Sequence, residues 1–379
     1  MRRKEDFFLS NEDETFSQAS LPAKKMQEEK IQNLKIKGGK WLLYALTFVA
    51  FSLLCVFIAL FLLFNGPSKT LRDSLVLSAR QHSSIKWLPS LFLSDSTLSK
   101  IDTDSYEIIT ETLPVEEITP QTSEVFVNGM SLISIQKERF SAKLLIVQDP
   151  SQVFVGTSSH FQGEEKGLDI FSITKKYDAV AGVYGGEYPD RYGLGNGSTP
   201  ISITYSEGKL VYSGNTKNTF IGLTLENRLV ISEGMTAEKA KEMGIRDGVS
   251  FRKGSSLITL EEGQVTACYT RKNPGRAQRT VIGQRADGAI LLLTTDKKGP
   301  LDLGATLNEL TDVMLSYGAV SAAVIDSGSS AHLYYKDWHN TYEHGPLSTL
   351  QKKGLVGENT AEAENKKMPT YFLVREEEK

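Results

Sequence analysis

The chain has 379 residues and few cysteines: Cys55 and Cys268 are its only two. Cys55 lies inside a long apolar run and Cys268 stands alone outside it, which excludes an internal disulfide in the C-terminal part and the Cys/His spacings typical of zinc. A domain exported without disulfides depends on its hydrophobic core, which roughly 280 residues are enough to build. This pattern fits a bacterial envelope better than a product of the endoplasmic reticulum.

Several signatures of other function classes are also missing. The net charge of −3 gives no indication of a nucleic-acid partner. The glycine-rich stretch 184–198 lacks both G-x-G-x-x-G spacing and a following helix, which argues against a dinucleotide cofactor, and no cofactor is assigned. No G-x-S-x-G elbow is present, which disfavours an ordinary serine hydrolase. The acidic and histidine residues at 337–344 fit no common metal spacing, so we interpret them as a solvated loop and expect no metal.

The most distinct segment is residues 41–64, which contain 24 residues without a charge. As a helix this segment is about 36 Å long, enough to cross a bilayer with some tilt. A buried core helix of this length would have a polar face. A cleaved signal peptide has a shorter apolar region, and no A-x-A-like site follows closely. We therefore expect an uncleaved membrane anchor in contact with the lipid bilayer.

Flanking charges predict the orientation of this anchor. The twenty residues before it contain six lysines, whereas the twenty after it contain three cationic residues. This asymmetry favours a single-pass protein of the cell membrane with a cytoplasmic N-terminus and an extracellular C-terminal domain. Residues 1–40, rich in Glu, Lys, Gln and Ser, are expected to be a disordered cytoplasmic tail. Residues 65–116 are expected to form a partly helical stalk, and residues 117–379 the globular domain.

The globular part alternates many strands with three or four short helices, which predicts an α+β domain with a mixed sheet. Its most informative region is 279–330. The apolar runs 279–284 and 289–295 are separated by a four-residue turn and should form an antiparallel hairpin, with Gln284 opposite Ala289 and Arg279 opposite Thr294. A helix that starts with capping-box spacing at Thr306 then leads into a second apolar strand.

This strand–helix–strand crossover makes the two outer strands parallel, so their carboxyl ends lie at the same edge, where open α/β sheets bind ligands. Asp296 follows the first of these strands and Asp326 ends the second. With Arg279 one or two residues from Asp296, we expect a guanidinium and two carboxylates to converge on one crevice. The alternatives are that the aspartates only form turns and that Arg279 makes a structural salt bridge to Asp296.

These segments resemble the phosphodiester glycosidase family. Residues 278–288 are similar to its P-R-T-A-I-G-Q-x-x-D-G segment, 303–307 to its G-x-T-L helix start, and 325–330 to its L-D-G-G-x-S loop. Residues 184–190 stand where the family has N-x-G-x-F-x-D. Residues 367–374 resemble the closing strand of its bacterial, exopolysaccharide-associated branch. The similarity covers roughly residues 100–375, in order and with fitting spacing, and identifies an N-acetylglucosamine-1-phosphodiester α-N-acetylglucosaminidase-like domain.

The resemblance implies hydrolysis of a sugar-1-phosphodiester in an envelope or exported glycan. Arg279 would hold the phosphate bidentately, and Asp296 and Asp326 would act as base, nucleophile or charge stabiliser at the sugar. Lys297 or Lys298 would replace the arginine of the family's D-G-R. The expected substrate-binding residues are Gly185, Gly186, Asp190, Lys297, Ser327, Gly328, Ser329 and Ser330. Polysaccharide-assembly proteins are the expected protein partners.

Departures from the family pattern support a second hypothesis. Tyr184 replaces the family's Asn, Glu187 replaces a glycine of the same loop, and Ser327 replaces the first glycine of D-G-G. A bulky ring and an added carboxylate in a phosphate-binding loop would obstruct and repel a diester. The alternative is therefore a catalytically weak or inactive member that binds glycan or scaffolds exopolysaccharide assembly. His332, where the family usually has a small hydroxyl residue, is interpreted as local packing.

Overall fold

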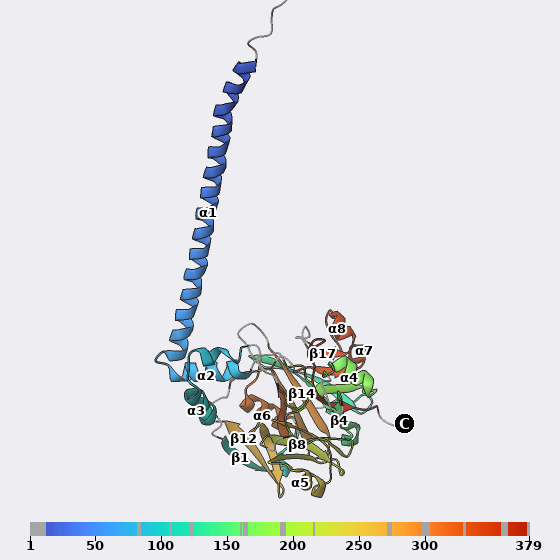
Figure 1. The fold of residues 1–379 in the computed structure, drawn as a ribbon. Helices are drawn as coiled ribbons and strands as arrows, with labels where there is room; N and C mark the ends of the chain where they lie inside the picture. The colour runs from blue at the N-terminus through green and yellow to red at the C-terminus, as the bar shows by residue number, and fades with distance from the viewer. Residues whose placement is uncertain are drawn as a thin grey trace, which may run out of the picture. The chain divides into compact units, whose positions relative to one another are not determined.

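The computed structural model forms two compact units, Met1–Gly66 and Pro67–Lys379, and each is described by itself (Figure 1). The structure describes residues 13–81, 85–105, 108–120, 124–159, 161, 166–189, 195–214, 217–270, 275–297, 304–328, 331–357 and 363–376. The side chains of residues 13–25, 27–39, 81, 102–105 and 297 also lie outside the described part.

The first unit is the helix α1 (Asp13–Asn65). Its part Lys40–Asn65 is long and apolar enough to cross a membrane. Residues 13–40 continue the same helix, so the expectation of a disordered tail does not hold there, and residues 1–12 lie outside the described part. The physical reason is that Glu, Lys and Gln are good helix formers, and extending an existing helix avoids the cost of a new nucleus.

The second unit includes most of the segment that we expected to be a stalk. It begins with α2 (Lys69–Gln81), η1 (Leu88–Leu91) and α3 (Asp95–Ser105). The strand β1 (Ile108–Pro114) then pairs with β12 (Gln264–Thr270) at the edge of the largest sheet. Because β1 is exposed along almost its whole length, it has no buried apolar face that the sequence pattern would reveal.

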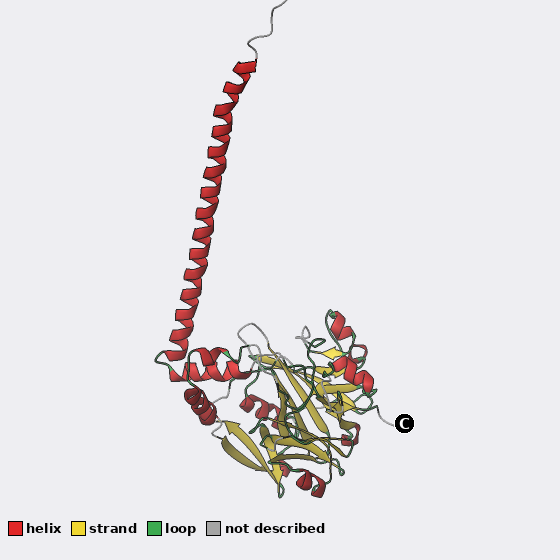
Figure 2. Ribbon diagram, in the orientation of Figure 1, coloured by secondary structure: helices red, strands yellow, loops and turns green. Residues whose placement is uncertain are grey.

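The largest sheet has eight strands in the order β1-β12-β11-β15-β13-β14-β3-β2. Figure 2 shows the strands of this unit in yellow and its helices in red. The helix α6 (Leu307–Ser316) connects β14 to β15 and packs on β11, β12 and β15. Both β14 and β15 are antiparallel to β13 between them, so they run parallel to each other, as the crossover predicts. The α+β class is confirmed, and the hydrogen-bonded strand pairs are antiparallel. The remaining bounds are β2 (Met130–Gln136), β3 (Phe140–Val147), β11 (Ser256–Glu261), β13 (Arg279–Arg285), β14 (Ile290–Lys297) and β15 (Ala319–Ser327).

The register of the β13–β14 hairpin differs from the predicted one by one residue. Gln284 pairs with Ile290, and Thr280 pairs with Thr294. The Arg285 amide donates to the Ala289 carbonyl at 3.0 Å, so the turn holds three residues, 286–288, and Gly288 adopts φ 95°. A three-residue turn that ends in a left-handed glycine moves every pair by one position relative to a four-residue turn. A slip of one residue exchanges the faces on which side chains lie.

Two five-stranded sheets complete the unit, in the orders β7-β6-β10-β8-β9 and β17-β16-β5-β18-β4. Their strands are β4 (Val153–Thr157), β5 (Ala181–Tyr184), β6 (Thr204–Ser206), β7 (Lys209–Tyr212), β8 (Thr219–Thr224), β9 (Leu229–Glu233), β10 (Ile245–Phe251), β16 (Leu333–Tyr335), β17 (Leu355–Val356) and β18 (Thr370–Val374). The short helices are η2 (Val115–Glu117), η3 (Pro150–Gln152), α4 (Ile170–Lys176), α5 (Ala237–Glu242), α7 (Trp338–Thr341) and α8 (Thr349–Lys352).

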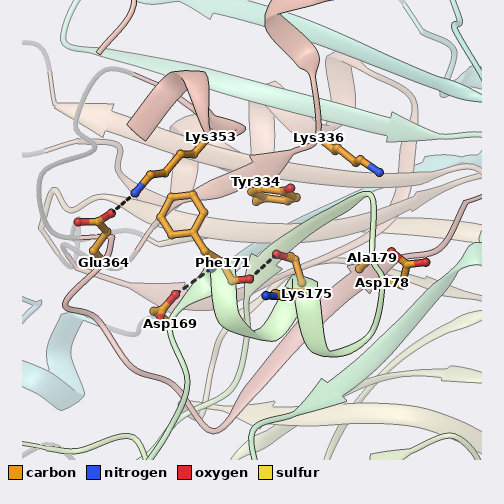
Figure 3. Close-up of a pocket in the computed structure, with 10 residues that line it drawn as sticks. Asp169, Phe171, Lys175, Asp178, Ala179, Tyr334, Lys336, Lys353 and Glu364 are labelled. Atoms are coloured by element: carbon orange, nitrogen blue, oxygen red, sulfur yellow. Dashed lines mark hydrogen bonds and ion pairs between the residues drawn. The ribbon is translucent and has the colours of Figure 1, made fainter. Parts of the chain in front are cut away.

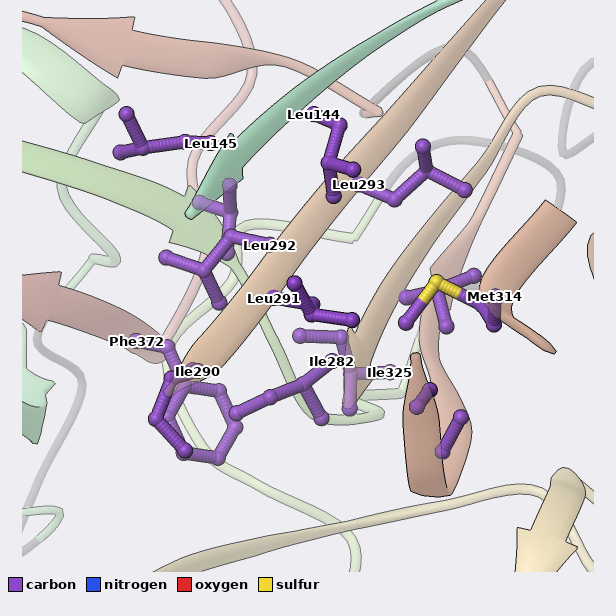
Figure 4. Packing of buried hydrophobic residues seen from close by; sticks show 14 of the residues in the cluster. Leu144, Leu145, Ile282, Ile290, Leu291, Leu292, Leu293, Met314, Ile325 and Phe372 are labelled. Carbon is purple, nitrogen blue, oxygen red and sulfur yellow. The ribbon is translucent and has the colours of Figure 1, made fainter. Parts of the chain in front are cut away.

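The main hydrophobic core surrounds β14 (Figure 4). Four consecutive residues of this strand, 290–293, are fully buried, so both of its faces are covered. The core also contains Met314 from α6 and Phe372 from β18. A strand covered on both faces is encoded as a continuous apolar run rather than an alternating one, as seen here. This core fixes the central strands whose ends carry the candidate site.

Candidate active site

Asp296 and Asp326 lie on one face of the eight-stranded sheet, at the same end of β14 and β15. Thr280 of β13 is opposite both Thr294 of β14 and Asp326 of β15, so these three side chains share a face. Asp296 is two residues beyond Thr294 and therefore points to the same face. Asp296 is 6% exposed and Asp326 is 5% exposed. The sequence-based prediction that the two strand ends come together is confirmed.

Arg279 does not share that face, which corrects the expected convergence of three charged groups. It pairs with Ser327, and its backbone amide donates to the Thr295 hydroxyl at 2.9 Å. Its guanidinium donates to the carbonyls of Ala305 at 3.3 Å and Gly275 at 3.2 Å. The one-residue difference in the hairpin register is the cause, because it places Arg279 opposite Thr295 instead of Thr294. Arg279 therefore ties together the chain before β13 and the start of α6.

The expected glycine loop lies directly against Asp326. The Gly186 amide donates to the carbonyl of Ile325 at 2.8 Å, and the Thr370 hydroxyl donates to the carbonyl of Gly185. Gly186 has φ 100°, and a Cβ atom there would lie 2.5 Å from the Thr370 hydroxyl oxygen. Only glycine therefore fits between β18 and the end of β15 without displacement.

The other predicted binding residues are distributed differently. Ser327 is opposite Arg279, on the face away from the carboxylates. Gly328, with φ 104°, donates its amide to the Gln278 carbonyl at 2.8 Å and so holds the end of β15 to β13. Lys297 ends β14 opposite Phe140, and its side chain lies outside the described part. Asp190, Lys298, Ser329 and Ser330 also lie outside the described residues.

Three groups that the sequence analysis did not select accompany the carboxylates. Gly357, just after β17, approaches Asp296 so closely that a Cβ atom there would lie 2.7 Å from its Oδ2. Ser141 is opposite Asp296, and Thr280 is opposite Asp326, so both hydroxyls belong to the carboxylate face. Each hydroxyl oxygen is buried and has no hydrogen-bond partner among the described residues. Such hydroxyls are available as donors or acceptors for a ligand.

Tyr184 is fully buried, so it does not obstruct an accessible surface. Its ring lies 5.9 Å from that of His332 and 5.1 Å from that of Tyr371, and its hydroxyl donates to the Ala363 carbonyl at 3.3 Å. Burial, and then the negative charges of Asp169 and Asp326, raise the pKa of Tyr184 well above its ordinary value. The phenol therefore stays neutral beside the Asp326 carboxylate.

Tyr371 and Glu187 complete the surroundings of this loop. Burial, followed by Tyr184 and by the carboxylates of Asp169 and Asp326, raises the pKa of Tyr371 in the same way. The Glu187 carboxylate accepts from Asn218 at 2.8 Å and pairs with Arg252 at 3.4 Å. The added charge of this loop is therefore balanced locally. Among the described residues, no group of three or more His, Cys, Asp or Glu side chains could hold a metal ion.

Comparison with known proteins places these residues in a family. Residues 177–375, more than half of the chain, match the sequence profile named phosphodiester glycosidase. The chain belongs to the phosphodiester glycosidase family. The matched span contains both aspartates, Arg279, the glycine loop and β18, so the predicted family membership is confirmed. No curated protein sequence matches the chain at a significant level.

Two solved structures are similar to the chain at low sequence identity. The zebrafish N-acetylglucosamine-1-phosphodiester α-N-acetylglucosaminidase catalytic domain, auto-inhibited by its pro-peptide, is 15% identical, with a TM-score of 0.48 over 71% of this chain and 88% of that one. A hypothetical protein from Synechocystis is 11% identical, with a TM-score of 0.43 over 66% of this chain and 63% of that one.

The close approach at Gly186 gives a first prediction. Gly186→Ala should lower the free energy of unfolding by about 2–4 kcal/mol, because it adds both left-handed strain and a collision with Thr370. Gly208→Ala is the matched control, since Gly208 also has positive φ but a Cβ atom there would meet nothing within 4 Å. It should cost about 1 kcal/mol. Urea denaturation measures both, and equal losses would contradict the packing described around Gly186.

The buried phenol of Tyr184 gives a pH prediction. Its pKa is raised in the folded state, so the folded protein holds the proton more tightly than the unfolded chain. Stability is then unaffected by this group below about pH 10 and falls as the pH rises through the folded pKa. Tyr184→Phe should make this alkaline loss less steep by up to about 1.4 kcal/mol per pH unit. Denaturation between pH 8 and pH 11 tests it; identical slopes would show that Tyr184 does not contribute.

Proposed function

We propose that this protein is a membrane-anchored hydrolase that cleaves a sugar-1-phosphodiester bond in an envelope or exported glycan. Family membership supports the glycosidase class. The observation that carries the proposal is the pair of buried carboxylates, Asp296 and Asp326, on one face at the ends of β14 and β15, the two strands that flank β13. Glycoside hydrolysis commonly uses two carboxylates that flank the anomeric carbon.

In the proposed reaction, water attacks the anomeric carbon while the bond from that carbon to the phosphate oxygen breaks. One carboxylate accepts the proton of the water or stabilises the oxocarbenium-like transition state, and the products are the free sugar and a phosphomonoester. The hydroxyls of Thr280 and Ser141, on the carboxylate face, would donate to oxygen atoms of the sugar or the departing phosphate. Lys297 would add a positive charge at the end of β14.

Arg279 has a different role in this proposal from the one that the sequence suggested. Its guanidinium binds the carbonyls of Gly275 and Ala305 on the other face of the sheet. We therefore assign Arg279 the role of positioning β13. The residue after Arg279 is Thr280, which lies between β14 and β15, the two strands that carry the aspartates. Removing a buried arginine would lower stability and activity together, because its carbonyl partners would lose their donors.

The second candidate is an inactive family member that binds glycan without cleaving it. The observation that favours it is the absence of the Arg279 guanidinium from the carboxylate face, since that group was the expected phosphate clamp. A lysine is a point charge without the planar fork that matches two phosphate oxygens. Such a protein would retain the glycan-binding surface and lose the rate enhancement.

Catalysis can be tested with an N-acetylglucosamine-1-phosphodiester, by measuring release of the phosphomonoester. Asp296→Asn and Asp326→Asn should each reduce kcat by a factor of about 10²–10⁴, because each substitution removes a carboxylate that acts on the reacting atoms. Asp287→Asn is the matched control: Asp287 is an exposed aspartate in the β13–β14 turn and should leave kcat unchanged. If the wild-type protein turns over the substrate no faster than Asp326→Asn, hydrolysis by this site is excluded and the glycan-binding hypothesis remains.

The anchor and its orientation can be tested independently of activity. We expect the Lys40–Asn65 segment to span the membrane with the lysine-rich side in the cytoplasm. Protease added to intact cells should therefore digest the domain after Pro67 and leave an epitope within the first 40 residues intact. Digestion of the N-terminal epitope with protection of the domain would reverse the orientation, and release of the chain by carbonate washing would exclude a membrane span.

A further inference from the structure

The helices at the start of the second unit expose apolar side chains. α2, η1 and α3 pack against one another. Leu71 of α2 is 48% exposed, Leu91 of η1 is 63% exposed, and Trp87, the N-cap of η1, is 40% exposed. Side chains of this kind lose contact with water when they lie at a lipid surface, where tryptophan is enriched. We call residues 67–81 and 85–93 the juxtamembrane segment.

The juxtamembrane segment also has a positive net charge. It contains four Lys and Arg residues and one acidic residue, Asp73. The Asp73 carboxylate pairs with the Arg72 guanidinium at 2.8 Å, so the acidic charge is balanced locally. Cationic side chains beside exposed apolar ones are typical of segments that lie in a membrane interface, because the cations bind lipid headgroups while the apolar groups enter the acyl boundary.

Chain continuity makes the bilayer the partner within reach of this segment. The apolar helix ends at Asn65, and α2 begins at Lys69. A link of four residues spans at most about 14 Å, whatever its conformation. In the proposed anchored protein, the first turn of α2, which contains Leu71, therefore stays beside the membrane surface.

A cavity between α4, β16 and α8 also has aromatic side chains in its wall, but its charges do not suit lipid (Figure 3). Phe171 and Tyr334 stand there among three carboxylates and three lysines. Moving six charged groups from water toward hydrocarbon would cost far more than the burial of two rings would contribute. The juxtamembrane segment is therefore the better candidate for lipid contact.

The juxtamembrane segment packs at the end of the large sheet that carries the carboxylates. A Cβ atom on Gly275 would lie 2.7 Å from the backbone nitrogen of Ser78, so α2 touches the chain just before β13. The Gly275 carbonyl accepts from the guanidinium of Arg279, the first residue of β13, at 3.2 Å. β13 begins where β14 and β15 end, because both strands are antiparallel to it. α2 and the two aspartates therefore share one end of the sheet.

The opposite end of the sheet is marked by the β13–β14 turn. Ala286 and Gly288 of this turn line a groove together with Thr224 and Glu226. Leu225, between the last two residues, is 72% exposed. The seven residues of β13 separate this end from the carboxylate end by about 23 Å. Leu225 is thus an exposed apolar position at the end of the sheet away from the aspartates.

We propose that the juxtamembrane segment is a lipid-contact surface, which rests on the bilayer and holds the carboxylate end of the sheet toward it. Leu71, Trp87 and Leu91 enter the interface, and the lysines and arginines of the segment bind headgroups. The inference rests on the membrane anchor of the proposed function. A hydrolase held in this way meets glycans that are carried at the membrane surface.

Lipid contact can be measured by tryptophan fluorescence of the full-length protein in vesicles of phosphatidylcholine and phosphatidylglycerol, with acyl chains brominated near the headgroup or near the bilayer centre. Trp41→Phe is the background, because Trp41 belongs to the apolar helix, whereas Trp338 is buried. The Trp87 signal is the difference between this background and the same protein with Trp87→Phe. Bromine near the headgroup should quench the Trp87 signal more than bromine near the centre, because interfacial side chains enter only about 5–10 Å.

Leu225→Trp, made in the protein that carries Trp41→Phe and Trp87→Phe, is the matched control. Its added signal should be equal in brominated and unbrominated vesicles. A Trp87 signal that brominated lipid leaves unchanged would overturn the lipid-contact surface, and quenching of the Leu225→Trp signal would overturn the orientation of the sheet.

The outcome of this measurement is independent of the other proposals. Resistance of the reconstituted protein to carbonate washing reports the membrane span, whereas quenching reports the juxtamembrane segment. The fluorescence readout does not use turnover. Failure of the lipid contact is therefore distinguishable from failure of the anchor and from failure of the proposed hydrolysis.

Discussion

The pairing of β13 with both β14 and β15 is the interaction on which the candidate site depends. β13 lies between the two strands that carry the carboxylates, so its register with each of them fixes which side chains share a face. Thr280 is the point where both registers meet, opposite Asp326 on one side and Thr294 on the other. Apolar packing on both faces of β14 prevents a slip, because a slip would move four buried residues into the wrong layer.

The second constraint is the close approach of other backbone segments to the two strand ends. Gly186 comes from the loop after β5 and hydrogen bonds to the carbonyl before Asp326, while Gly357 comes from the end of β17 and touches Asp296. Both glycines have positive φ and lie where a Cβ atom would collide with a neighbour. The five-stranded sheet β17-β16-β5-β18-β4 and its loops thus contribute backbone at Gly186 and Gly357, together with the buried rings of Tyr184 and Tyr371, to the surroundings of the carboxylates.

The sequence predicted those elements whose pattern is local. The capping box at Thr306 is present, and the apolar run of β14 is a buried central strand. The sequence did not predict the hairpin register, because the number of turn residues depends on Gly288 adopting a left-handed conformation. The same sequence is also compatible with a four-residue turn. It missed β1 because an exposed edge strand has no apolar periodicity. Tyr371 was missed because its role depends on a contact with Tyr184, 187 positions earlier in the chain.

The departures from the family pattern do not all weigh equally against catalysis. Tyr184 is buried with Tyr371 in a hydrophobic cluster separate from the main core, so its ring takes no space from a ligand at the surface. The Glu187 carboxylate is balanced by Arg252, and its charge would repel a diester much less than an isolated carboxylate. Arg279 itself matches the family pattern, and what weighs against catalysis is its position, because the strand register places it on the face away from the carboxylates. An active enzyme of this architecture must therefore stabilise the departing phosphate with groups other than the Arg279 guanidinium, and the buried hydroxyls of Ser141 and Thr280 lie on the carboxylate face.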